Sequence, residues 1–137
     1  MSARVIQPAG WPRPAGYANG MAAEGRIVAV AGQVGWDPVT ERFAATDMPG
    51  QVAQALRNIA AVLEAAGAGP EHVVRLTWYV TDLQAYIAAR GPIHEGYRAV
   101  FGKHFPAMSV VEVKGLMERG ALVEIEATAV VTASPVS

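Results

Sequence analysis

Two carboxylates alternate along a predicted strand near the end of the chain, in the run Leu122-Val123-Glu124-Ile125-Glu126-Ala127. A carboxylate held beside a substrate can accept a proton from an attacking water molecule, which is the role of a general base. Alternation in a strand also places both side chains on one face, where they could simply meet solvent. The residues alone favour this second interpretation and leave the first one open.

A second feature is the run Phe105-Pro106-Ala107-Met108-Ser109-Val110-Val111-Glu112-Val113. Proline ends the preceding segment, and the β-branched residues that follow predict a buried strand. Met108 is uncharged and donates no hydrogen bond, so it offers a flexible apolar wall to a pocket or merely fills space. Ser109 has neither the turn nor the His–Asp partners of a nucleophile.

Three further residues could contact a ligand. Gly32 ends a predicted strand and would let a ligand approach the backbone, although a β-bulge requires the same residue. Tyr17 follows a proline- and glycine-rich segment that predicts no regular structure before it, and its phenol could donate a hydrogen bond or only pack. His94, on a predicted helix, could donate or accept near neutral pH, or lie on the surface.

A metal site is not predicted. The histidines, at positions 72, 94 and 104, have none of the spacings of metal ligands, and the chain contains no cysteine. No glycine-rich phosphate loop opens a predicted helix.

The helices and strands that must position these residues can be predicted from hydrophobic periodicity and from the glycine, proline and capping residues that end each element. In the strand Val73 to Val80, alternation assigns Val74, Leu76, Trp78 and Val80 to the core face, with Val73 on the opposite face. The remaining elements are predicted as a strand over 26–33, a helix over 48–66, a turn over 83–89, a helix over 92–101 and strands over 107–113 and 120–132. We therefore predict a single domain over 1–137 of the α+β class, with two helices packed on one face of a mixed sheet.

Composition limits the possible partners. Hydrophobic residues make up 52% of the 137 residues and charged residues 17%, so we expect part of the apolar surface to lie between subunits. The formal charge of −1, without a basic run, argues against nucleic acid. No apolar run approaches the length of about 18 residues that crosses a membrane, and we expect a cytoplasmic protein.

The two runs above, together with Val30-Ala31-Gly32-Gln33, resemble the RidA family (also called YjgF/YER057c/UK114), from Tyr17 to about Val130. The resemblance implies a chorismate-mutase-like fold and a homotrimer with a site at each subunit junction. It also implies hydrolysis of reactive enamines and imines without a cofactor. In that family the position of Met108 usually holds an arginine that grips a substrate carboxylate, and an asparagine lies near the position of His94.

Residue by residue, the resemblance assigns water activation to Glu124, hydrogen-bond donation to Tyr17, and backbone contacts to Gly32, Met108 and Ser109. Our leading hypothesis is an enamine or imine deaminase with altered substrate specificity. A non-catalytic trimer that binds a small metabolite is the alternative, and an endoribonuclease is a third, less favoured one. If the carboxylate anchor has moved, the basic residues considered for it are Arg75, Lys103 and Arg119.

Overall fold

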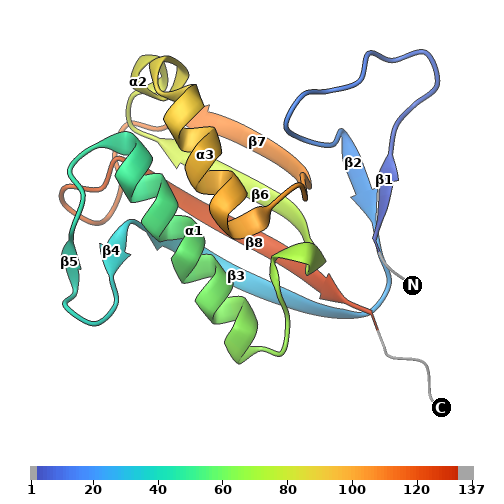
Figure 1. Ribbon diagram of the computed structural model, residues 1–137, viewed down its shortest axis with the longest axis horizontal. Helices are drawn as coiled ribbons and strands as arrows, with labels where there is room; N and C mark the ends of the chain where they lie inside the picture. Colours follow the sequence, from blue (N-terminus) through green and yellow to red (C-terminus); the bar gives the residue numbers. More distant parts are fainter. Residues whose placement is uncertain (1–2, 133–137) are drawn as a thin grey trace.

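The computed structural model describes residues 3–132 of the chain (Figure 1). Its helices are α1 (Met48–Ala65), the 3₁₀ turn η1 (Pro70–His72), α2 (Leu83–Ala88) and α3 (Arg90–Phe101). Its strands are β1 (Arg4–Ile6), β2 (Gly20–Ala22), β3 (Arg26–Val34), β4 (Trp36–Asp37), β5 (Arg42–Phe43), β6 (Val73–Val80), β7 (Ala107–Glu112) and β8 (Val123–Val131). Within residues 3–132, no helix combines the length and the apolar character needed to cross a bilayer.

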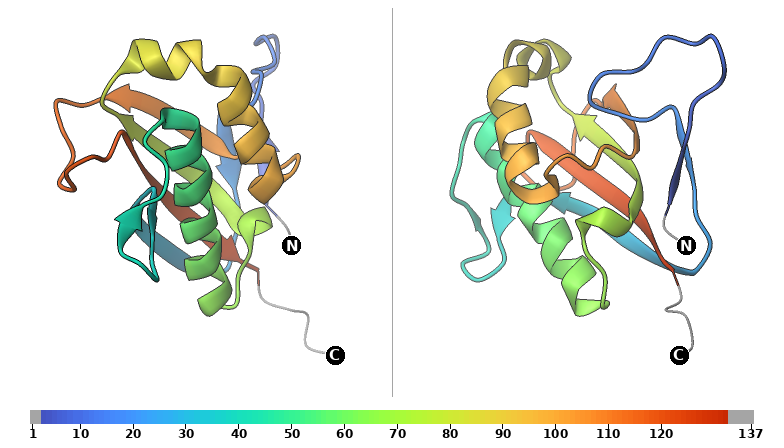
Figure 2. Two further views of the ribbon diagram at one scale, coloured as in Figure 1. Left: turned by 60° about the vertical axis from the view of Figure 1, so that its left-hand side comes forward. Right: turned by 45° about the vertical axis from the view of Figure 1, so that its right-hand side comes forward.

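Four strands form the central sheet, in the order β3-β8-β6-β7. Strand β8 is antiparallel to both of its neighbours, whereas β6 and β7 are parallel. The two long helices, α1 and α3, pack against each other and lie on the same face of this sheet (Figures 1 and 2). The predicted α+β class, with two helices on one face of a mixed sheet, is therefore confirmed.

Helix α1 is the helix predicted over 48–66. Asp47 caps its start, since the side-chain oxygen accepts a 3.1 Å hydrogen bond from the N–H of Gly50. Beyond its end, Gly67 adopts a φ of +74°, a left-handed conformation that is readily available to glycine. The apolar residues spaced three and four apart along one face are fully buried against the sheet: Val52, Leu56, Ile59 and Leu63.

The segment after β6 differs from the prediction. Instead of a turn over 83–89, the chain forms helix α2, capped by Asp82, which accepts a 3.0 Å hydrogen bond from the N–H of Ala85. Helix α3 begins at Arg90, earlier than the predicted start at Pro92. The N–H groups in the first turn of a helix have no acceptor within the helix, so a proline there costs no hydrogen bond. Pro92 therefore lies inside the first turn of α3 and does not mark its start.

Strand β6 has the predicted bounds, and Leu76, Trp78 and Val80 are buried in the core as expected. The assignment of Val73 to the opposite face is wrong, because Val73 is completely buried. The assignment of Val74 to the core is wrong as well, because Val74 is only half-buried. A bulge between Val73 and Arg75 shifts the register against β8. One extra residue in a strand reverses the alternation, which returns Val73 to the core.

The opposite face of the sheet has no helix on it (Figure 2). By strand alternation it carries polar side chains from β6 and β8, namely Arg75, Thr77, Tyr79, Glu124 and Glu126. Two apolar side chains on this face are well exposed in the single chain, Ile27 at 70% and Val111 at 42%. We call this surface the open face.

Two short hairpins, β1–β2 and β4–β5, were not predicted. Strands of two or three residues are too short to show a periodicity. The N-terminal segment that contains β1 and β2 reaches the edge strand β7, where Ala18 pairs with Ala107 and its N–H donates to the carbonyl of Pro106. This pairing brings the N-terminal segment next to the start of β7.

Candidate functional site

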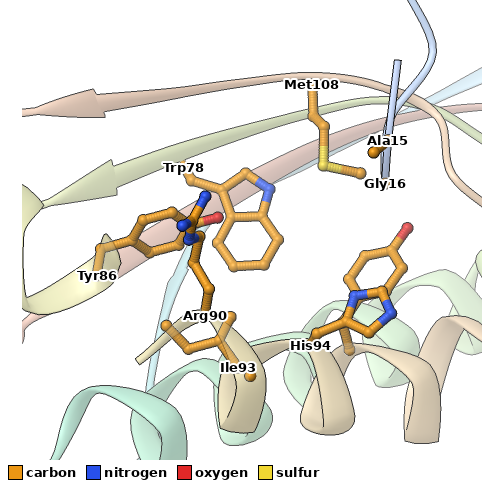
Figure 3. Close-up of a pocket in the computed structure, with 10 residues that line it drawn as sticks. Ala15, Gly16, Trp78, Tyr86, Arg90, Ile93, His94 and Met108 are labelled. Atoms are coloured by element: carbon orange, nitrogen blue, oxygen red, sulfur yellow. The ribbon is translucent and has the colours of Figure 1, made fainter. Parts of the chain in front are cut away.

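A cavity of about 510 Å³ lies between the central sheet and helices α2 and α3 (Figure 3). The sheet contributes Trp78 and Met108, and the N-terminal segment contributes Ala15 and Gly16. The helical side contributes Tyr86, Arg90, Gly91, Ile93, His94 and Tyr97. A hollow of this volume with mostly apolar walls and a few polar groups is typical of small-molecule sites. We call it the Met108 cavity.

Met108 reaches this cavity because of the register between two parallel strands. It lies opposite Leu76, and Val110 lies opposite Trp78. Leu76 and Trp78 are buried beneath the helices, and residues paired across a sheet point the same way, so Met108 also points toward the helices. Ser109, the next residue in the strand, points to the open face and is exposed.

His94 lies at the same cavity, on helix α3. Its ring stacks on Phe105 with centroids 5.9 Å apart and 5° between the planes, and on Tyr97 at 6.5 Å. Burial raises the pKa of Tyr97, whose hydroxyl donates a hydrogen bond to the carbonyl of His104. The structure thus brings two of the predicted site residues, Met108 and His94, to one place.

Arg90 also lines the Met108 cavity, although it is not among the site residues predicted from the sequence. The basic residues considered as carboxylate anchors, at positions 75, 103 and 119, do not line it. Arg90, Ile93, His94 and Tyr97 have the spacing of one helix face. This signal was present in the sequence, but a helix start placed at Pro92 left Arg90 outside the helix.

Glu124 lies on the open face, directly beside Gly32. Strand β3 bulges between Val30 and Gln33, where its register against β8 shifts. The bulge brings Gly32 so close to Glu124 that a Cβ atom on residue 32 would lie 2.7 Å from the carboxyl carbon. Glycine at position 32 therefore leaves the space in which the carboxylate sits.

Glu126, two residues further along β8, has a different environment. The hydroxyl of Tyr79 donates a 2.7 Å hydrogen bond to its carboxylate. This hydrogen bond raises the pKa of Tyr79, and desolvation and the negative charges of Glu126 and Glu124 act in the same direction. The carboxylate of Glu124 forms no such bond within residues 3–132. Glu124 is therefore the better placed of the two to bind a water molecule.

Tyr17 lies apart from both groups. It is 43% exposed and lines a second hollow of about 500 Å³, together with Arg13, Lys103 and His104. Within one chain, the six predicted residues are therefore distributed over separate places: Met108 and His94 at the cavity, Gly32, Glu124 and Ser109 on the open face, and Tyr17 at the second hollow.

No group of three or more histidine, aspartate and glutamate side chains in the described part of the chain is arranged to hold a metal ion.

Comparisons with known proteins cover almost the whole chain. The sequence pattern of the family described as "Endoribonuclease L-PSP" matches residues 12–131. A RutC family protein of Pyrococcus horikoshii is 36% identical over 118 residues, which cover 86% of this chain and 90% of that protein. The human 2-iminobutanoate/2-iminopropanoate deaminase is 30% identical over 127 residues, which cover 93% and 89% of the two chains.

Among solved structures, a Rid family protein of Yersinia pestis superimposes with a TM-score of 0.83 and 34% identity, covering 96% of this chain and 100% of that one. Likeness to the Rid structures confirms the chorismate-mutase-like architecture that the resemblance implied. The chain belongs to the endoribonuclease L-PSP family, which is also known as the Rid or YjgF/YER057c/UK114 family.

Proposed function

We propose that the chain is an enamine and imine hydrolase of the RidA type, acting as a homotrimer on substrates other than the usual 2-imino acids. The observation that carries the proposal is the fit of Glu124 against Gly32, which holds a carboxylate on the open face beside accessible backbone. Relatives named 2-iminobutanoate/2-iminopropanoate deaminase support the class of reaction.

In this reaction the oxygen of water bonds to the imine carbon while the carboxylate of Glu124 accepts one proton. The C=N electron pair moves to nitrogen, which takes up a proton. In the carbinolamine that results, the hydroxyl group gives up its proton and the amine nitrogen takes up a second one. The carbon–nitrogen bond then breaks, so that ammonia leaves and a carbonyl group remains. Tyr17 would donate a hydrogen bond to the substrate, and the backbone at Gly32, Met108 and Ser109 would position it. The imine carbon is itself electrophilic, so no cofactor takes part.

A homotrimer would bring together site residues that lie on opposite faces of the sheet within one chain. Glu124 and Gly32 lie on one face of the sheet, and Met108 and His94 lie on the other, so a single site that contains all four needs more than one copy. The exposed apolar side chains on the open face support its burial between subunits. We expect light scattering at several protein concentrations to give three chain masses, and a stable monomer would remove the interfacial site.

The test of the proposed function is turnover on a panel of imines generated in solution, followed by release of the carbonyl product. We expect turnover of imines that carry no carboxylate next to the C=N carbon. We expect little turnover of 2-iminopropanoate, because loss of charge-assisted hydrogen bonds costs about 1.5–3 kcal/mol, or about 10- to 100-fold in binding. Family-like efficiency on 2-iminopropanoate would show that Met108 does not set the specificity.

The substitution Met108→Arg is expected to raise hydrolysis of 2-imino acids by about 10- to 100-fold. The strand already points residue 108 into the cavity, and arginine is only moderately longer than methionine. Its planar fork can donate two parallel hydrogen bonds to a carboxylate. The measurement is kcat/KM on 2-iminopropanoate for the variant and the unmodified protein.

The matched control is the double variant Met108→Arg/Glu124→Gln. Binding a substrate does not activate water, so the gain should disappear in the double variant. A single variant that remains trimeric and binds a carboxylate, yet stays inactive, would contradict the hydrolase and favour a trimer that only binds a metabolite.

A further inference from the structure

Arg90 presents a positive charge to the Met108 cavity that its own chain does not neutralise. Its Nε donates a 3.3 Å hydrogen bond to the carbonyl of Ile87, and it forms no ion pair within residues 3–132. Arg90 is exposed and its guanidinium carries five N–H donors, so most of its hydrogen-bonding capacity meets solvent and is available to a ligand. In Figure 3 the guanidinium lies beside the hydroxyl of Tyr86. Its charge opposes the rise that burial causes in the pKa of Tyr86, which agrees with this proximity.

Trp78 supplies a second, independent sign of a missing partner. The residue is only 2% exposed, it lines the same cavity, and its indole N–H has no hydrogen-bond partner within residues 3–132. A buried donor without a partner is unfavourable, and native proteins seldom leave one. Figure 3 shows the indole nitrogen on the side of the ring that faces Met108. The flexible methionine can move, and the N–H would then reach an acceptor bound in the cavity.

The remaining walls select the body of the ligand. Tyr86, Ile93, Tyr97 and Met108 present mainly carbon to a volume of about 510 Å³. A three-carbon or four-carbon imino acid would leave most of this space empty. A ring-sized apolar group would fill it and contact the faces of the aromatic side chains. The cavity therefore combines one cation, one neutral donor and a large apolar volume.

We propose that Arg90 is the carboxylate anchor of this protein, and that its ligand is a carboxylate with a remote C=N or C=O group and an apolar body the size of an aromatic ring. The carboxylate binds to Arg90, which lies on the helical wall of the cavity, opposite the wall that holds Met108. The indole N–H of Trp78 donates to the C=N or C=O group. That the protein converts this ligand as a substrate rests on the proposed function, whereas the binding of the ligand does not.

The test measures binding by calorimetry, without turnover, using 4-oxo-4-phenylbutanoate as the probe. Two compounds separate its features: 4-oxo-4-phenylbutanamide lacks the charge, and 4-oxopentanoate has a methyl group in place of the ring. We expect the unmodified protein to bind the probe at least about 10-fold more tightly than either compound.

The variant Arg90→Gln should bind the probe about 10- to 100-fold more weakly and bind the amide nearly unchanged. Arg98→Gln is the matched control, because Arg98 lies on the same helix and is exposed like Arg90, but does not line the cavity. Arg90→Lys, which keeps the charge but loses the fork, should give an intermediate affinity. Trp78→Phe should weaken binding of the probe by about 2- to 13-fold, which is the effect of losing one neutral hydrogen bond.

The proposal is overturned if the unmodified protein does not prefer the acid over the amide, or if Arg90→Gln retains that preference while keeping its fold and oligomeric state. An equal loss in Arg98→Gln would also overturn it, because the effect would then be one of general charge. Arg90-dependent binding without imine turnover would keep this site and remove the hydrolase. Imine turnover without Arg90-dependent binding would do the reverse.

Discussion

Glu124→Gln is expected to reduce imine turnover by about 10²- to 10⁴-fold, the usual contribution of a positioned general base. Glutamine has nearly the size and shape of glutamate, so the packing against Gly32 is preserved. Its amide cannot accept a proton from water at neutral pH. The loss should therefore fall on kcat, and the affinity for a product analogue should change little.

Two companion variants separate this effect from a general change at the open face. Glu126→Gln removes the neighbouring carboxylate, which is bonded to Tyr79, and should cost far less activity. Gly32→Ala keeps the carboxylate but displaces it, since the new Cβ would lie 2.7 Å from its carbon. Because the end of a glutamate side chain can move, activity should fall while the fold persists. Full activity of Glu124→Gln would exclude Glu124 as the base.

Gln51→Met is expected to lower the free energy of unfolding by about 3 kcal/mol. Gln51 is 1% exposed, and its amide joins helix α1 to the loop before β8. It donates to the carbonyls of Ala45 and Gly120 at 3.2 and 3.0 Å, and accepts a 2.7 Å hydrogen bond from the N–H of Leu122. Methionine fills a similar volume but leaves these three groups without partners.

Thermal unfolding at a fixed protein concentration measures this effect, and the midpoint should fall by about 10 °C for a chain of this size. Gln84→Met is the matched control. Gln84 is exposed on helix α2, so the same substitution there should change stability by less than about 0.5 kcal/mol. Equal midpoints for the two variants would show that the buried amide contributes nothing.

Local sequence patterns were sufficient to predict the main elements of this fold. The helix over 48–66 was readable because a capping aspartate, a regular apolar spacing and a terminal glycine all act within a few residues. The strand from Val73 to Val80 was readable from its alternation, except at the bulge that buries Val73. Whether an extra residue is accommodated depends on the partner strand, which the local pattern does not contain.

Which side chains meet at the candidate site depends on contacts between segments that are distant in the sequence. The bulge of β3 against β8 sets Gly32 beside Glu124, although the two residues are 92 positions apart in the chain. The parallel register of β6 and β7 turns Met108 toward Trp78, and the packing of α3 adds Arg90 to the same cavity. Periodicity reports which face of an element is apolar. Which faces then enclose a cavity depends on contacts between distant segments, and these follow only from the assembled fold.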